Sequence, residues 1–336
     1  MLPGLVIAAG LMLAASSAVL AQTAITELET VKQGEIDGLG QTEDVEFRDD
    51  GFDRMTVPVR LSGTGPYRFL VDTGADRTAI SRELAAKLKL QSGNSASLHS
   101  VAGVSRVATA TVPNLQLTRR NVKVIDAPLL DRANMGADGI LGVDSLRFQR
   151  VLFDFAAQTM SIVPSQSVEQ IDEPGAIVVR ATRRHGRLVL TRATANGRPV
   201  TVVLDTGSQI SIGNSALRRQ LLRTNQLGTS HQVELESVTG HTIIGDYVMV
   251  RELEMGGVQL KNLAIVFTEA HTFKRLGLEK KPGLLLGMNA MRAFKKVSID
   301  FANKKLRIVL PEFSALEPRL AAADGASQTR RVPFVP

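Results

Sequence analysis

The sequence predicts an all-β protein made of two similar units within one chain. The triplet Asp-Thr-Gly begins at Asp72 and again at Asp205, each time directly after an apolar run. Around each triplet the chain repeats a hairpin pattern before it, a short helical pattern after it and a similar closing segment. Such self-similarity is typical of an internal duplication. The 336 residues are enough for two domains that each bury a core.

A β-hairpin is expected before each aspartate. In the segment 55–71, alternating apolar residues flank a glycine-containing turn, so that the second strand leads to Asp72. The segment 187–204 repeats this plan before Asp205, and its turn is the dipeptide Asn-Gly at Asn196, a strong hairpin signal. Both aspartates should therefore stand at the end of a strand.

The two units keep the same order after the triplets. Short helical patterns occupy 81–90 and 214–223, and each is followed by a glycine-bearing turn, at 100–103 and 237–240. The closing segments 139–164 and 284–311 also match, each with two apolar residues, a glycine, a helical turn and a hairpin. Their equivalent acids, Asp154 and Asp300, precede hairpin turns and are interpreted as structural.

Asp72 and Asp205 need a physical explanation because each follows an apolar strand. A buried ionised side chain without partners costs several kcal/mol. Each position must therefore supply hydrogen bonds to the carboxylate or hold it for chemistry.

Composition excludes several other kinds of site. The chain has no cysteine, and none of its five histidines is paired at the i, i+4 spacing of a helical zinc motif, so no metal is expected. No GxSxG elbow is present. The net charge of +7 comes from scattered basic pairs and aromatic residues are few, which indicates a solvated surface and no nucleic-acid partner.

The N-terminal 21 residues are uncharged and end in a small-residue pattern suited to signal-peptide cleavage. We expect export to the periplasm or beyond; the alternative is an uncleaved anchor in the membrane, facing the periplasm. Residues 22–51 form an acidic extension, which is flexible or an edge strand. The remaining boundaries are lobe 1 at 52–166, a linker at 167–186, lobe 2 at 187–312 and a flexible tail at 313–336.

These motifs together resemble the aspartic proteases of the pepsin and retropepsin clan. The resemblance rests on the triplet with a small residue after it, the glycine turn about thirty residues later, and the later apolar-apolar-Gly strands at 140–142 and 285–287. It implies two retropepsin-like, acid-protease β-barrel lobes related by pseudo-twofold symmetry, as in exported bacterial aspartyl proteases of tandem form. Units of this length are closer to a retroviral protomer than to a pepsin lobe.

The resemblance implies a catalytic pair, Asp72 and Asp205, and no cofactor. Two carboxylates within hydrogen-bonding distance share one proton, so one acts as base on a water while the other acts as acid. Which aspartate is protonated stays open. By the same resemblance, the hydroxyls of Thr73 and Thr206 bond across to the opposite lobe. The active-site loops are completed by Gly74 and Gly207, which allow close backbone approach, and by Ala75 and Ser208.

The turns at Gly103 and Gly240 match the family's flaps, the hairpin tips that close over an extended peptide. Ordinary hairpin turns are the alternative interpretation. Retroviral proteases carry an arginine that braces the triplet loop, at the position of Val143 and Met288 here, so Asp76 must find another partner.

The residue after each triplet is expected to make the two carboxylate environments unequal. Ser208 can donate a hydrogen bond to the ionised Asp205, whereas Ala75 cannot do so for Asp72. With one donor missing, the pair is expected to hold its shared proton to higher pH.

The sequence thus predicts an exported aspartic endopeptidase that hydrolyses extended protein or peptide substrates as a monomer with its lobes paired internally. Membrane association is expected only if the N-terminal segment stays uncleaved. The alternative from another class is a catalytically silent peptide-binding or assembly module of the same fold. A further alternative is a dimer in which each lobe pairs with its twin in another chain.

Overall fold

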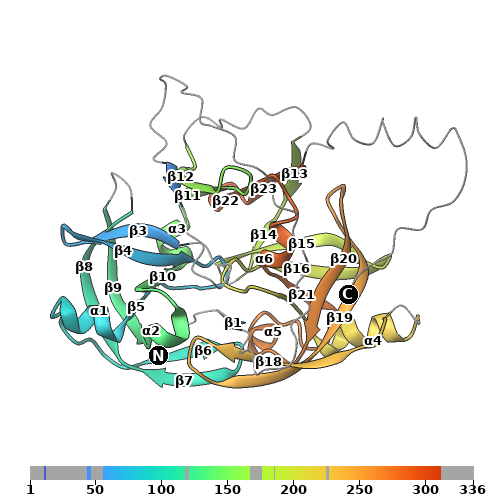
Figure 1. The fold of residues 1–336 in the computed structure, drawn as a ribbon, viewed down its shortest axis with the longest axis horizontal. Helices are drawn as coiled ribbons and strands as arrows, with labels where there is room; N and C mark the ends of the chain where they lie inside the picture. Colours follow the sequence, from blue (N-terminus) through green and yellow to red (C-terminus); the bar gives the residue numbers. More distant parts are fainter. Residues whose placement is uncertain are drawn as a thin grey trace, which may run out of the picture. The chain divides into compact units, whose positions relative to one another are not determined.

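The computed structural model describes residues 11–12, 44–46, 56–117, 121–166, 176–184, 186–224 and 227–311. Strands dominate these residues, as expected, and the helices are short (Figure 1). The predicted signal peptide or anchor lies outside the described residues except for 11–12, and the acidic extension except for 44–46. The predicted tail at 313–336 also lies outside them.

The first lobe is a closed barrel of six strands, in the order β10-β4-β3-β8-β9-β5. The predicted hairpin before Asp72 is present as its β3–β4 pair, in antiparallel register. The strands of this barrel are β3 Thr56–Leu61, β4 Thr64–Val71, β5 Ala79–Ser81, β8 Thr109–Gln116, β9 Asn121–Leu130 and β10 Gly139–Leu141.

The second lobe repeats this circuit. Its strands run in the order β19-β20-β17-β21-β16-β15, and pairing of β19 with β15 closes the ring. Asn196 and Gly197 both have positive φ in the β15–β16 turn, as an Asn-Gly hairpin requires. The strands are β15 Arg187–Ala195, β16 Arg198–Leu204, β17 Ser211–Gly213, β19 Thr242–Met255, β20 Val258–Phe267 and β21 Gly283–Leu286.

Both lobes carry a hairpin outside this ring of strands. In lobe 1 it is β6 with β7, a separate two-stranded sheet, and in lobe 2 it is β18 with the start of β19. The backbone of β1 pairs antiparallel with β18. The bounds are β1 Leu11–Met12, β6 Ala96–Ser100, β7 Gly103–Val107 and β18 His231–Ser237.

The two longer predicted helices are confirmed in shortened form. They begin at similar caps: the Ser81 hydroxyl accepts from the Leu84 N–H at 3.0 Å, and the Asn214 side chain accepts from the Leu217 N–H at 2.9 Å. The helices are α1 Arg82–Lys87, α2 Arg132–Met135 and α3 Val143–Leu146 in lobe 1, and α4 Ser215–Leu222, α5 His271–Arg275 and α6 Met288–Met291 in lobe 2.

A six-stranded sheet joins the lobes, in the order β13-β23-β22-β11-β12-β2. Its centre is the antiparallel pair of β11 from lobe 1 and β22 from lobe 2. The two structural acids face their turns as predicted, with the carboxylates of Asp154 and Asp300 accepting from the Ala157 and Asn303 N–H groups at 2.9 Å. The strands are β2 Asp44–Glu46, β11 Gln149–Asp154, β12 Thr159–Pro164, β13 Ile177–Arg180, β22 Lys296–Asp300 and β23 Lys305–Val309.

The segment interpreted as a linker contributes one strand to the six-stranded joining sheet and one to the sheet of lobe 2. Its β13 pairs with β23, and β14 (Thr182–Arg184) pairs with β15. The strand pattern of these short segments is weak in the sequence, because most of their residues are exposed. Of the acidic extension, residues 44–46 form the edge strand β2, one of the two alternatives considered.

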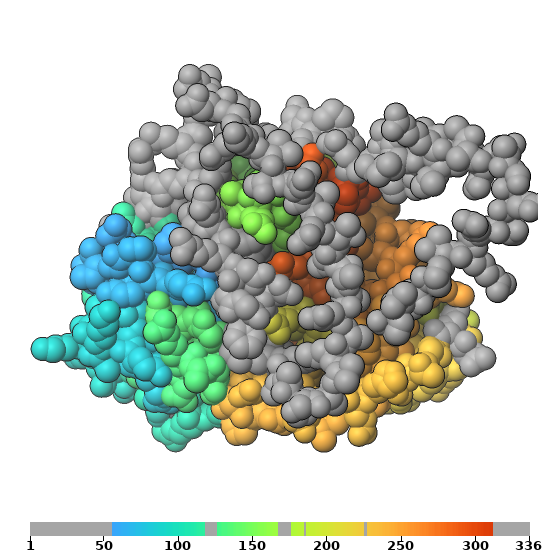
Figure 2. Space-filling model, in the orientation of Figure 1, coloured from blue at the N-terminus to red at the C-terminus, as the bar shows by residue number. Residues whose placement is uncertain are grey.

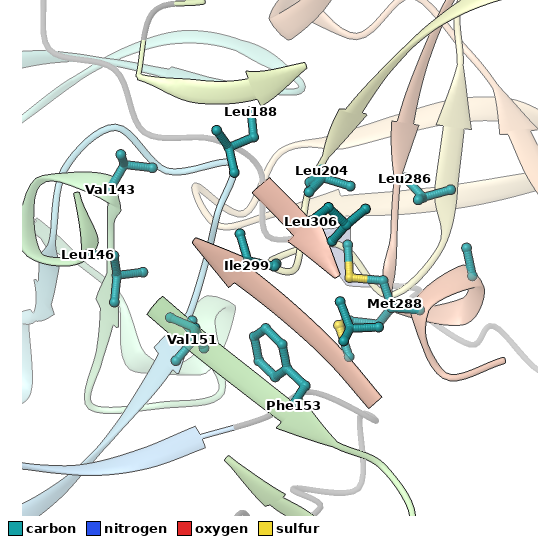
Figure 3. Close-up of a cluster of buried hydrophobic side chains, with 14 of the residues drawn as sticks. Val143, Leu146, Val151, Phe153, Leu188, Leu204, Leu286, Met288, Ile299 and Leu306 are labelled. Carbon is teal, nitrogen blue, oxygen red and sulfur yellow. The ribbon is translucent and has the colours of Figure 1, made fainter. Parts of the chain in front are cut away.

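One apolar core runs through both lobes and the joining sheet. Figure 3 shows Val151 and Phe153 of β11 near Ile299 of β22, in a cluster that also contains Leu204 and Leu286. In the space-filling view the first lobe, blue to green, and the second lobe, yellow to red, lie against each other (Figure 2). The strands that end in the two aspartates therefore rest on a shared core, which fixes their relative position.

Candidate active site

Each aspartate stands at the end of a strand that is held by an apolar-apolar-Gly strand. In lobe 1, Leu141 of β10 pairs parallel with Val71, and its carbonyl accepts from the Asp72 N–H at 3.0 Å. In lobe 2, Leu286 of β21 is in the same relation to Asp205, also at 3.0 Å. The two turns are thus built alike, as the duplicated pattern predicts.

The two threonines of the triplets bond crosswise between the lobes. The Thr73 hydroxyl donates to the Leu204 carbonyl at 2.9 Å and accepts from the Thr206 N–H at 3.1 Å. The Thr206 hydroxyl donates to the Val71 carbonyl at 2.7 Å and accepts from the Thr73 N–H at 3.0 Å. All four bonds are buried, so they lock one loop against the other.

The glycines let the backbone approach the carboxylates closely. The Gly74 N–H donates to Asp72 Oδ1 at 2.8 Å. A Cβ at Gly207 would lie 2.3 Å from the Asp72 Cγ, which no side chain tolerates. Gly207 of lobe 2 therefore lies directly against the carboxyl of lobe 1.

The carboxyls of Asp72 and Asp205 meet in a buried site, where each residue is only 1% exposed. Burial and then the neighbouring Asp72 raise the pKa of Asp205 well above its ordinary value, against the opposing effects of Arg187 and the Gly207 N–H. A pair in this setting keeps one proton, so it offers one base and one acid at the same place.

The residues that follow Val143 and Met288 brace the triplet loops. Asp144 Oδ1 accepts from the Thr78 N–H at 2.9 Å and from its hydroxyl at 2.8 Å. Asn289 Oδ1 accepts from the Ser211 N–H and hydroxyl, both at 2.9 Å. Sequence reasoning assigned these residues no role, although they are equivalent in the repeat.

Asp76 finds its partner in the other lobe. Its Oδ1 lies 3.5 Å from the Nε of Arg187, and its Oδ2 lies 4.0 Å from an Nη of Arg275. Arg187 is 1% exposed and is one of the largest fully buried side chains. The sequence held a signal for it, because Arg54 and Arg187 each stand 18 residues before an aspartate. Arg54 lies outside the described residues.

The expectation for Ser208 is wrong. Its hydroxyl donates to the Ile210 carbonyl at 2.7 Å, so its one proton does not go to the Asp205 carboxylate. Ala75 and Ser208 are both fully buried, and their carbonyls accept from the Val143 and Met288 N–H groups at 2.8 Å. These two residues therefore hold the loops through their backbone carbonyls. The lack of a hydroxyl at residue 75 does not make the environments of the Asp72 and Asp205 carboxylates unequal.

The turns at Gly103 and Gly240 are the tips of hairpins that reach into the opposite lobe. Val101, in the first tip, is buried among lobe 2 residues, and its carbonyl accepts from the His271 N–H at 2.8 Å. Val238, in the second tip, is buried among lobe 1 residues. Both glycines have positive φ, at 140° and 76°. Each tip is therefore in contact with the other lobe and is more than an ordinary surface turn.

The part of the chain that the structure describes has neither a candidate metal site nor a candidate membrane-spanning helix. It contains no group of three or more His, Cys, Asp or Glu side chains placed to hold a metal ion. None of its helices is both long and apolar enough to cross a membrane.

Comparison with family models gives the same division of the chain. Residues 57–148 match the aspartyl protease family of gag polyproteins, and residues 191–290 match a second aspartyl protease family. No curated protein matches the sequence. Each match contains one Asp-Thr-Gly triplet and one apolar-apolar-Gly strand. The chain is a tandem of two aspartyl protease domains and belongs to the retropepsin-like aspartic proteases.

Proposed function

We propose that this chain is an aspartic endopeptidase in which Asp72 and Asp205 activate a water molecule for peptide hydrolysis. The observation that carries the proposal is the burial of both carboxyls at one point, with the pKa of Asp205 raised by burial and by Asp72. A purely structural acid gains nothing from a second carboxyl placed against it. Paired carboxyls that share a proton are suited to acid–base chemistry.

The reaction uses the singly protonated pair. The ionised carboxylate takes a proton from the water as its oxygen attacks the peptide carbonyl carbon, and the protonated carboxyl donates to the carbonyl oxygen. As the tetrahedral intermediate collapses and the C–N bond breaks, the carboxyl that took the proton from water gives it to the leaving nitrogen, and the other carboxylate regains a proton from a hydroxyl of the intermediate. The crosswise bonds of Thr73 and Thr206 keep the carboxyls in place through these steps.

The proposed substrate is an extended segment of a protein or peptide, cleaved between apolar residues. Two lobes that face each other with a hairpin tip on each side suit an extended strand, for which backbone pairing gives affinity and alternate pockets give selectivity. The chain is proposed to act as a monomer in the periplasm or outside the cell, or anchored in the membrane facing the periplasm if its N-terminal segment stays uncleaved.

The test is incubation of the purified protein with an unfolded protein substrate, with and without pepstatin. We expect cleavage that pepstatin abolishes. Binding of the substrate without cleavage at any pH between 3 and 8 would instead favour a silent peptide-binding or assembly module. Light scattering on the same sample separates a monomer from a dimer that pairs lobes between chains.

A further inference from the structure

Arg187 begins β15, and Asp205 directly follows the end of β16, the antiparallel partner of β15. In the antiparallel pair of β15 and β16, Val189 faces Val203, and the same register continued by two residues places Arg187 opposite Asp205. Opposite residues of antiparallel strands have their side chains on the same face, close enough to interact. The buried guanidinium of Arg187 therefore lies near the Asp205 carboxyl and acts on it through its charge, without a direct ion pair between the two.

The positive charge of Arg187 is only partly compensated. Its contact with Asp76 is a 3.5 Å ion pair through Nε, and its buried Nη1 has no hydrogen-bond partner among the described residues. Charges are weakly screened at buried sites, so Arg187 acts strongly on its neighbours. It lowers the pKa of Asp205 against the dominant effects of burial and Asp72, and it also contributes to lowering the pKa of His99.

Asp76 works against Arg187 because it is an anion on the loop that carries Asp72. The other charged or titratable groups around this point are Arg184 on β14, which pairs with Arg187 across the strands, Arg275 and His271 on α5, and His99 on β6. Among the residues that the structure describes, such an acid–arginine pair is present on one side of the Asp72–Asp205 pair, and the residue equivalent to Asp76 in lobe 2 is the neutral Gln209.

We propose that Arg187 is a positioning residue that holds one negative charge on the Asp72–Asp205 pair, and that Asp76 limits the strength of this effect. The inference rests on the proposed protease reaction, for which the singly ionised pair is the active form. Arg187 thus sets the lower edge of the working pH range by keeping the pair from taking a second proton, and Asp76 keeps Arg187 oriented across the two lobes.

The experiment compares Arg187→Gln with Asp76→Asn in the full chain, by the pH dependence of kcat/KM. Arg187→Gln removes the cation and should move both limbs of the kcat/KM profile to higher pH by about one unit. Loss of the anion should move both limbs downward, because it removes a negative charge and leaves Arg187 uncompensated. A merely structural ion pair would give lower rates in both variants with no opposite shifts.

Three further variants keep the test decisive. Arg187→Lys should restore the limbs toward those of the wild type. The double variant Arg187→Gln/Asp76→Asn leaves no unpaired buried charge, so it should fold even if a single variant does not, and its limbs should lie between those of the singles. Arg192→Gln is the control, since Arg192 is an exposed residue of the same strand, and its limbs should not move.

Carboxyl ¹³C NMR titration of the aspartates gives a second measurement that needs no activity. If the wild type hydrolyses no peptide, the proposed function fails, while the titration still decides the effect of Arg187 on the pair. The inference would be overturned if the limbs of the pH profile, or the titrating aspartate signals, moved in the same direction in Arg187→Gln and Asp76→Asn. It would also be overturned if neither variant moved them.

Discussion

His99 and His271 join the first hairpin tip to the second lobe, with the Nδ1 of His99 2.9 Å from the Nε2 of His271. Their rings stack with centroids 5.2 Å apart. A hydrogen bond between these nitrogens needs one proton, with one ring as donor and the other as acceptor. Doubly protonated rings would set two N–H groups and two charges against each other. The contact therefore belongs to the state in which at least one ring is neutral.

This contact should weaken as the pH falls. Burial, followed by neighbouring cations such as Arg275 for His99 and Lys274 for His271, lowers both histidine pKa values below 6.5. Between pH 6.5 and the lowered histidine pKa values, the unfolded state therefore binds more protons than the folded state. The stabilisation from the His99–His271 contact is present above pH 6.5 and is lost as the pH falls through that window. Hydrogen exchange of residues 96–107, corrected for intrinsic rates, should report easier opening at pH 5 than at pH 7.5.

Two substitutions separate this effect from general loosening. His99→Ala should remove most of the pH dependence of opening in residues 96–107. His241→Ala is the matched control, because His241 contacts Thr239 within its own hairpin tip. An unchanged pH dependence in His99→Ala would show that another group controls this hairpin.

Asp72→Asn and Asp205→Asn should each abolish hydrolysis while the fold stays intact, because the proposed reaction needs both an acid and a base. The measurements are kcat/KM on an unfolded substrate and circular dichroism. Substantial activity in either single variant would contradict the shared-proton mechanism.

The same Asp205→Asn variant should be more stable than the wild type near neutral pH. A carboxyl whose folded pKa is raised above its ordinary 3.8 contributes stability below 3.8 that is lost as pH rises through the folded value. Urea unfolding should therefore show a stability difference between variant and wild type that grows from pH 3.5 to pH 7. A difference that stays constant over this range would contradict the raised pKa.

Thr206→Val should lower the free energy of unfolding by about 1–3 kcal/mol, because it leaves the buried Val71 carbonyl and the Thr73 N–H without their partners. Activity should fall as well, since the two loops lose half of their crosswise bonds. Thr206→Ser keeps the hydroxyl and should retain most of both properties. Equal losses in the valine and serine variants would point to packing of the methyl group as the cause.

Gly207→Ala should reduce kcat by about 100-fold, because its Cβ would displace the Asp72 carboxyl from which it lies 2.3 Å. Gly228→Ala is the matched control, since that exposed glycine has open space around it and an ordinary φ. If Gly207→Ala were as active as the control, the close approach of the second loop to Asp72 would have no catalytic importance.

The parts of the fold that were predictable depend on local patterns. The hairpin before Asp72, the Asn196-Gly197 turn and the helices α1 and α4 all have turn residues, caps or periodicity within about ten residues of chain. Because the sequence repeats, the second lobe could then be predicted from the first. The candidate pair could be located for the same reason, because each aspartate carries its own triplet and apolar strand.

The parts that were not predictable depend on packing between distant segments. Asp76 meets Arg187 only after the lobes have docked, and the repeated spacing of Arg54 and Arg187 does not show which residue either arginine contacts. The Ser208 hydroxyl has a choice of acceptors that the sequence does not rank, and it bonds to Ile210. The burial of Val101 and Val238 in the opposite lobes likewise follows from the meeting of two surfaces.

The one-sided pairing of Asp76 with Arg187 has a consequence for how a peptide lies in the site. In a homodimer both halves are identical, so a peptide running in either direction meets the same surroundings. Here one end of the pair has an ionic cluster, and the other has Gln209 at the equivalent position. Because a peptide is itself directional, the fused chain can distinguish its two orientations, which two identical subunits cannot do.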